Sequence, residues 1–336
     1  MEIWTETTTV RTCETDLSGL WKPSCFFQAM QEAATHHAAS WGYNFASLLA
    51  AGHVWILSRL RVRFGGFPQE GEEVTIRTWP RGVARRVLFV RDFELRGAGG
   101  RSLAVATSAW VLIDPGSRRL LSPQVLGRAV PDNDGLAALD EPLEKLGLPE
   151  GLPERLTVVA GYSAVDMLGH VNNARYVEWA CDSLPFDLLC TRRLRWLQVN
   201  YLNEVRPGER VSVHAGEHGG GWAVYGVNLE RPQRAFEAVA SFGDGEEPQR
   251  NKGTLLFSGD AESAETQRTQ RTLTPSALSA SLPWVLHPAR LSQRPPAPRM
   301  ASSRTRGDCV LAGRHRAAAA AACADGPASG GPGVRR

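Results

Sequence analysis

Hydrophobic and polar positions alternate along the chain in two series of strand-length segments, and one helix-length segment lies near the start of each series. The first helical segment begins at Pro23 and ends near Gly42, and the second covers residues 173–184. The predicted strands cover residues 4–11, 54–64, 73–80, 85–95 and 102–114 in the first series and 155–162, 194–201, 210–216, 222–230 and 235–242 in the second. This pattern predicts an α+β protein in which antiparallel strands surround two helices.

The two series can be superimposed on each other without gaps in two blocks. At an offset of 150 the matched pairs are Asp16 with Asp166, Gly19 with Gly169 and Phe26 with Tyr176. At an offset of 137 they include Val62 with Val199, Gly71 with Gly208 and Val74 with Val211. Because the offset decreases between the two blocks, the first series has extra chain there, and we place it at residues 43–51. Since two similar halves bury more apolar surface together than apart, we predict a tandem repeat.

The repeat divides the chain into four regions. We expect a first half over residues 1–120, a connector over residues 121–153 and a second half over residues 154–243. The remaining residues, 244–336, are rich in Gly, Pro, Ser, Arg and Ala and keep no hydrophobic period, which is typical of disorder.

The halves differ most in the segment that enters the second predicted helix. Residues 166–176 read Asp-Met-Leu-Gly-His-Val-Asn-Asn-Ala-Arg-Tyr, so a carboxylate, an imidazole and two amides meet a helix start with unpaired N–H groups. The positions His170, Asn172, Asn173 and Glu204 correspond to Leu20, Lys22, Pro23 and Phe67. One half therefore carries proton-handling groups and the other an apolar wall, which suits a substrate with a long hydrocarbon chain.

This segment and the repeat resemble the acyl-[acyl carrier protein] thioesterases, whose second half carries an Asp-x-Asn-x-His-Val-Asn-Asn motif entering a helix. Here residues 166–173 read Asp-Met-Leu-Gly-His-Val-Asn-Asn, and a later strand ends in Asn203-Glu204-Val205. The first half is similar to the same family over residues 31–38, 55–59 and 108–111, and the similarity covers about residues 3–242. The resemblance implies a double hotdog fold, in which each half is an antiparallel sheet wrapped around a central helix. It also implies hydrolysis of fatty acyl thioesters, with acyl carrier protein as the partner, in fatty acid biosynthesis.

By this resemblance Asp166, His170 and Glu204 are the candidate catalytic residues. We expect Glu204 to act as general base on a water molecule, if partial burial raises its pKa. His170 would orient the water or protonate the departing thiolate, and Asp166 would fix the tautomer of His170. Asn172 and Asn173, with the N–H groups of the helix start, would hold the oxyanion. This chemistry requires no metal and no organic cofactor.

Each candidate also has a simpler structural interpretation. The alternatives are a turn for Asp166, helix capping for Asn172 and Asn173, a hydrogen-bonded structural histidine for His170 and an exposed strand-end carboxylate for Glu204.

Two positions depart from the family pattern. Leu168 occupies the place of the family's asparagine and cannot form a side-chain hydrogen bond. Val205 occupies the place of a cysteine in plant members, which excludes a nucleophilic cysteine there. Leu168 motivates the alternative of a non-catalytic acyl-thioester-binding protein, and an acyl-CoA thioesterase or a related hotdog dehydratase are further alternatives. The sequence leaves three points open: the length of the acyl chain, the choice between acyl carrier protein and coenzyme A as the carrier, and the formation of a homodimer.

Charge and composition limit the classes of partner and the cellular location that we expect. Residues 251–336 carry twelve Lys and Arg against five Asp and Glu, whereas residues 1–250 carry 26 against 30, so nucleic acid is not an expected partner. No apolar run of about 18 residues and no targeting pattern is present, and we expect a cytoplasmic protein without a membrane span. The six cysteines lack the spacing of a zinc site.

Arg59, Arg61 and Arg63 alternate on one strand face, which indicates an ion-paired surface or a landing site for an acidic carrier protein.

Overall fold

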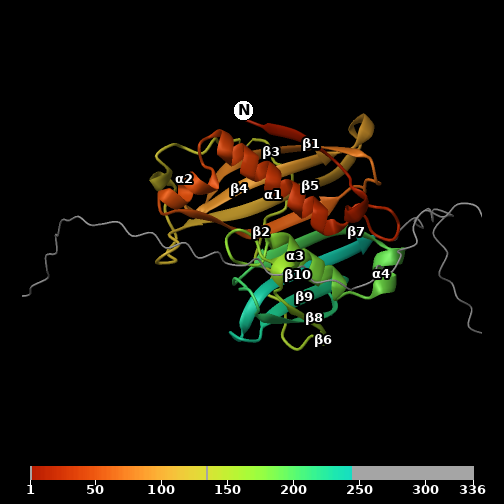
Figure 1. Cartoon of the computed structure of the whole chain (residues 1–336). Coiled ribbons are helices and arrows are strands. Elements are labelled where there is room, and N and C mark those ends of the chain that lie inside the picture. The colour runs from red at the N-terminus through yellow and green to blue at the C-terminus, as the bar shows by residue number, and fades with distance from the viewer. Residues whose placement is uncertain (1, 134, 244–336) are drawn as a thin grey trace, which may run out of the picture. The chain divides into compact units, whose positions relative to one another are not determined.

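The computed structural model describes residues 2–133 and 135–243, and the predicted disordered region lies outside them. Within the described residues ten strands form one antiparallel sheet in the order β1-β3-β4-β5-β2-β7-β10-β9-β8-β6 (Figure 1). The strands are β1 (Trp4–Thr9), β2 (Val54–Phe64), β3 (Glu73–Ala84), β4 (Leu88–Arg96), β5 (Ser102–Ile113), β6 (Glu154–Val159), β7 (Arg193–Tyr201), β8 (Arg210–His218), β9 (Gly221–Asn228) and β10 (Gln233–Gly243). The α-helices are α1 (Pro23–Ser40), α2 (Phe45–Ala50), α3 (Asn173–Asp182) and α4 (Phe186–Thr191).

The sheet is symmetric about the contact between β2 and β7, which pair antiparallel from Arg59 opposite Asn200 to Arg63 opposite Trp196. Strands β1–β5 with α1 and α2 form the first repeat, and β6–β10 with α3 and α4 form the second. The starts of β1 and β6, and equally the starts of α1 and α3, are separated by the larger of the two offsets found in the sequence. The prediction of a tandem hotdog fold is confirmed.

Each repeat packs an aromatic residue of its central helix against its own strands. In the first repeat the ring of Phe26 on α1 lies 5.1 Å from that of Phe64 on β2. In the second, Tyr176 on α3 occupies the matching position, 5.7 Å from Tyr201 on β7 and 5.3 Å from Phe236 on β10. Both helices lie on the same face of the sheet and contact each other (Figure 1). The core therefore runs without interruption under both helices.

The repeats differ in the chain that follows the central helix. α1 has 18 residues and is followed by α2, which falls inside the extra chain predicted at residues 43–51, whereas α3 has only 10 residues. α4 was not predicted, because Pro185 indicated only a helix end, whereas it also occupies the N-cap position of a new short helix. Within the described residues no helix combines the length and the hydrophobicity needed to cross a membrane.

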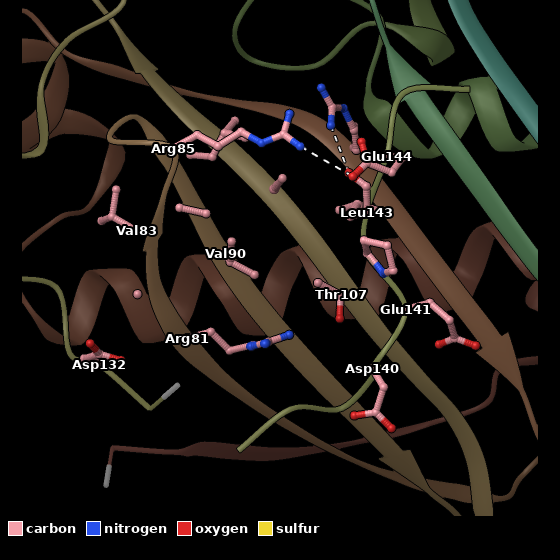
Figure 2. Close-up of a pocket in the computed structure, with 16 residues that line it drawn as sticks. Arg81, Val83, Arg85, Val90, Thr107, Asp132, Asp140, Glu141, Leu143 and Glu144 are labelled. Carbon is pink, nitrogen blue, oxygen red and sulfur yellow. Dashed lines mark hydrogen bonds and ion pairs between the residues drawn. The ribbon is translucent and has the colours of Figure 1, made fainter. Parts of the chain in front are cut away.

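The segment between the repeats lies across the face of the sheet opposite α1 (Figure 2). Its backbone carbonyls accept hydrogen bonds from sheet side chains: Trp79 Nε1 donates to Leu136 at 2.8 Å and Gln198 Nε2 donates to Glu144 at 2.7 Å. Because these donors belong to different repeats, the connector fixes both halves and is not a free linker.

We expect Gly226 to be essential for the packing beneath α3. It lies opposite Phe236 on β10, and a Cβ atom at Gly226 would be 2.7 Å from Phe236 Cδ1. Gly226→Ala should therefore lower the free energy of unfolding by about 1–3 kcal/mol, measured by urea denaturation.

The control is Gly161→Ala, because no heavy atom lies closer than 4.0 Å to a Cβ atom there. It should change the free energy of unfolding by less than about 0.5 kcal/mol. Equal losses in the two variants would contradict the steric explanation.

Candidate functional site

The segment before α3 forms a compact loop that is closed by a bridge between Val165 and Val171. The Asp166 N–H donates to the His170 carbonyl at 2.9 Å, and Gly169 adopts a φ of 75°, which glycine accommodates without strain. The first repeat has the matching bridge, between Thr15 and Trp21, and a left-handed glycine at the equivalent position. The loop is therefore a property of the fold, and the two repeats differ in the side chains that it presents.

The side chain of Asp166 shapes this loop. Its Oδ1 accepts a hydrogen bond from the Leu168 N–H at 2.9 Å, and Asp16 makes the matching bond to Ser18 at 2.8 Å. Within the described residues no hydrogen bond or ion pair joins the carboxylate of Asp166 to the ring of His170. The expectation that Asp166 fixes the tautomer of His170 therefore has no geometric support.

Glu204 is the carboxylate that contacts His170. Glu204 Oε2 lies 3.0 Å from His170 Nε2, although the two residues come from different segments, one after β7 and one before α3. The side chain of Glu204 is 19% exposed and that of His170 is 37% exposed, so water can reach the pair. With Glu204 on Nε2, the neutral imidazole would carry its proton there and leave Nδ1 as an acceptor.

The surroundings of Glu204 correct the expected pKa shift. Burial raises the pKa of Glu204, but hydrogen bonds from Arg118 and Arg206 and the charge of His170 outweigh it and hold the pKa below its usual value. Glu204 Oε1 accepts from Arg118 Nη2 at 2.6 Å and from Arg206 Nη2 at 2.9 Å. A carboxylate held in this way is a weak base, and the geometry favours Glu204 as the group that orients His170.

Arg231 holds the backbone of Glu204 in place. Its Nη2 donates to the Glu204 carbonyl at 2.7 Å, while Nε and Nη2 donate to Glu209 at 2.9 and 2.7 Å. The hydrogen bonds from Arg231 lower the pKa of Glu209 to about 2, and further bonds from the Arg206 N–H and Asn228 contribute to this shift. Glu209 is therefore ionised under all ordinary conditions and keeps Arg231 beneath the site.

The first turn of α3 offers hydrogen-bond donors toward the loop. Asn172 caps the helix, since its Oδ1 accepts from the Ala174 N–H at 3.0 Å, as its simpler interpretation predicted. The side chain of Asn173 donates to Gln31 Oε1 at 3.3 Å, and its carbonyl accepts from Tyr201 at 3.2 Å. Among the described residues no partner is present for the N–H of Asn173 or for Nδ2 of Asn172. These two groups are available to stabilise an oxyanion.

A cavity of about 410 Å³ extends from this loop along α1. Asn172 and Asn173 line it at one end, together with Leu168. Most of the remaining lining belongs to the first repeat and includes Trp41, Tyr43, Phe45, Leu48, Trp55, Phe89 and Trp110. The predicted apolar wall is thus present, and part of it is the extra chain of the first repeat. His170 and Glu204 lie outside the lining, so one loop contributes side chains to both the cavity and the reactive pair.

Three charged side chains belong to the lining, Glu32, Arg91 and Asp166, and Arg91 is the buried one. Arg91 lies on β4, and its Nη1 is 3.1 Å from His37 Nδ1 and 3.2 Å from Thr78 Oγ1. Burial lowers the pKa of Arg91 to about 10, and burial with the charge of Arg91 lowers the pKa of His37 to about 4. His37 is therefore a neutral acceptor that helps to pack the helix, as expected for a residue on its inner face.

A second cavity, of about 460 Å³, lies on the opposite face of the sheet under the connector. Figure 2 shows Arg85 extended toward Glu144, with Asp140 and Glu141 of the connector lining the same space. These charged walls do not suit a hydrocarbon chain.

The arginine row on β2 belongs to this covered face. Arg59 is only 7% exposed and donates to the Leu143 carbonyl at 2.9 Å, while Arg63 pairs with Glu141. Arg61 stacks on Trp196 at 4.7 Å. The row is therefore an ion-paired sheet surface, and Arg59 is too buried to receive a carrier protein.

Sequence reasoning missed Arg118 and Arg231. Arg118 is 86 residues from Glu204 in the chain and belongs to the first repeat. The strand order was the signal that could have found Arg118. β5 and β7 pair with β2 on its two sides, and both of them end beside the start of β2. A basic residue in the turn after β5 therefore lies near a residue that follows β7.

Comparison with known protein families gives a match over most of the described chain. The family model of the acyl-ACP (acyl carrier protein) thioesterase N-terminal domain matches residues 2–124. The model of the acyl-ACP thioesterase C-terminal domain matches residues 153–242.

Individual proteins agree with the family match. Oleoyl-acyl carrier protein thioesterase 1 of Arabidopsis thaliana is 28% identical over 255 residues, which is 68% of each chain. The palmitoyl-acyl carrier protein thioesterase of the same plant is 27% identical over 191 residues, and the match covers 52% of this chain and 45% of that relative.

Solved structures share the fold. An acyl-ACP thioesterase from Bacteroides thetaiotaomicron is 24% identical with a TM-score of 0.59, covering 72% of this chain and 98% of that one. The 12:0-ACP thioesterase from Umbellularia californica is 20% identical with a TM-score of 0.58, covering 72% and 97%.

The ion pair between Glu209 and Arg231 should make stability depend on pH in the acid range. The pKa of Glu209 falls from 4.5 to about 2 on folding, so its stabilisation is complete above pH 4.5 and is lost as the pH falls toward 2. Glu209→Gln should therefore unfold more easily at pH 7 and lose less stability than the wild type between pH 5 and pH 2. Urea denaturation across this range measures the difference, and Glu217→Gln, on an exposed strand position, should follow the wild type.

Proposed function

Because the chain belongs to the acyl-ACP thioesterase family, we propose that it hydrolyses fatty acyl thioesters on acyl carrier protein and releases the free fatty acid. The observation that carries this proposal is the close pair of His170 and Glu204, whose histidine lies on the loop that also lines the 410 Å³ cavity. All of these groups come from one chain, so the proposal does not require a homodimer. The predicted cytoplasmic location is part of the proposal.

The acyl chain would lie in the cavity beside α1, with its thioester at the start of α3. The apolar side chains of the first repeat match a hydrocarbon chain, and each buried methylene contributes about 0.8 kcal/mol. The carbonyl oxygen would then face the N–H of Asn173 and Nδ2 of Asn172. Both donors are free to stabilise the negative charge that develops on this oxygen.

His170 would activate the attacking water. Glu204 faces Nε2, so Nδ1 of His170 accepts a proton from water while the water oxygen bonds to the carbonyl carbon. The tetrahedral intermediate then collapses, the carbon–sulfur bond breaks, and the proton passes from His170 to the departing thiolate. The products are a fatty acid and the thiol of the carrier. Asp166 supports this arrangement by closing the loop that presents His170.

A non-catalytic acyl-thioester-binding protein is the second candidate. Leu168 favours it, since this residue lines the cavity where the family has an asparagine. The donors of Asn172 and Asn173 would still bind the carbonyl of a thioester that is not hydrolysed.

We expect Glu204→Gln and His170→Ala each to reduce hydrolysis of acyl-ACP by about 10²–10⁴-fold, because they break the same proton-transfer unit. Thiol release from purified acyl-ACP and acyl-CoA measures the effect, and Glu217→Gln should retain wild-type turnover. Full turnover in both site variants would exclude this pair as the catalytic unit.

Leu168→Asn should raise the turnover of acyl-ACP by up to about a hundredfold, since an amide at this place adds a donor for the oxyanion. Leu168 is 37% exposed, so the substitution should leave stability nearly unchanged. Leu229→Asn is the matched control, because this leucine is 40% exposed and lies outside the cavity lining, and it should have little effect. Saturable binding of acyl-ACP by the wild type without thiol release would favour the non-catalytic candidate.

A further inference from the structure

The carboxylate of Glu204 is shared between two kinds of partner. Arg118 and Arg206 both donate to Oε1, at 2.6 Å through Arg118 Nη2 and at 3.0 and 2.9 Å through Arg206 Nε and Nη2. Oε2 is left for His170 Nε2 at 3.0 Å. Because both oxygens have partners, tilting the carboxylate plane away from this position would break contacts on both sides, so the plane is held in one orientation.

The partners of Glu204 differ in origin. Arg206 is two residues away in the chain, and Arg231, whose Nη1 lies 3.8 Å from Oε1, is bound to Glu209. Tyr176 lies within electrostatic range of the carboxylate. Arg118 alone among these groups comes from the first repeat, which supplies no other charged contact to Glu204 within the described residues.

The turn that carries Arg118 is built to hold one conformation. Arg118 has a φ of 58°, which is uncommon for a residue with a side chain. Its N–H donates to the Asp114 carbonyl at 2.8 Å, and Asp114 Oδ1 accepts from the Ser117 N–H at 2.6 Å. A bridge between Ile113 and Leu120 closes the turn at the end of β5. A non-glycine residue in such a conformation is kept where the surrounding structure specifies it, and such residues concentrate at functional sites.

We propose that Arg118 is a positioning residue, by which the first repeat aims the Glu204 carboxylate at His170. This inference rests on the proposed function, since it assigns Arg118 to the same hydrolytic site. The side chain of Arg118 is 58% exposed, so its contribution is directional and electrostatic and adds little to the folded core. It follows that the repeat without reactive groups still takes part in the chemistry.

The test compares Arg118→Gln and Arg118→Lys with Arg63→Gln, a control in which an exposed arginine of the first repeat loses its pairing with Glu141. Without the hydrogen bond and the positive charge of Arg118, the Glu204 carboxylate should bind a proton more readily. The acid limb of the kcat/KM profile for acyl-ACP should move upward by about one pH unit in Arg118→Gln. kcat should fall about tenfold with KM nearly unchanged, because the substrate itself is not contacted. Arg118→Lys should restore part of the profile through its charge.

A second readout does not need catalysis. Titration of the Glu204 carboxylate by nuclear magnetic resonance should give a higher pKa in Arg118→Gln than in the wild type, because a hydrogen bond and a positive charge that lower it are removed, and no change in Arg63→Gln. Urea denaturation should give equal stabilities for the two variants. If the enzyme is active but neither the acid limb nor the titration of the Glu204 carboxylate moves in Arg118→Gln, the inference about Arg118 is overturned and the proposed function stands. A wild type without thioesterase activity would remove the proposed function, and the positioning role of Arg118 with it.

Discussion

The pairing of β2 with β7 is the constraint on which the rest of the molecule depends. It joins two five-stranded sheets edge to edge, so neither repeat leaves these backbone groups exposed to solvent. It places α1 and α3 on one face, where they share a core, and the connector on the other. It also brings the turn after β5 to the end of β7, which is why Arg118 meets Glu204. The site is therefore a product of the join between the repeats.

The two repeats show how one scaffold serves different purposes. Both use an aspartate to close the loop before the helix, and both use a left-handed glycine in that loop. In the second repeat the loop presents His170, whereas in the first the same position is Leu20. The first repeat has instead lengthened the chain after its helix and turned it into the cavity wall. The candidate reactive pair thus lies in the second repeat, and most of the cavity wall lies in the first.

Much of the fold could be predicted from the sequence, because the hydrophobic period and the repeat offset report directly on strands and core. The offset located the loop, the helix start and the aromatic pair of Phe26 and Tyr176. The site was harder to predict. Sequence distance hides contacts such as that of Arg118 with Glu204, and without them burial alone suggested a raised pKa. The position of the connector was equally hard to predict, because several of its contacts are made by backbone carbonyls, which every residue carries.

The first residue of each central helix decides whether a backbone N–H is present at the helix start. α3 begins at Asn173, whose N–H has no partner among the described residues, whereas α1 begins at Pro23, which has no N–H at all. The two repeats are therefore unequal in the peptide backbone as well as in their side chains. If the N–H of Asn173 serves the oxyanion as proposed, a histidine at Leu20 would not complete a site in the first repeat, since the donor at the helix start would still be missing. A change in the first repeat would therefore have to supply a backbone donor at the start of α1 as well as the side chains of the second repeat.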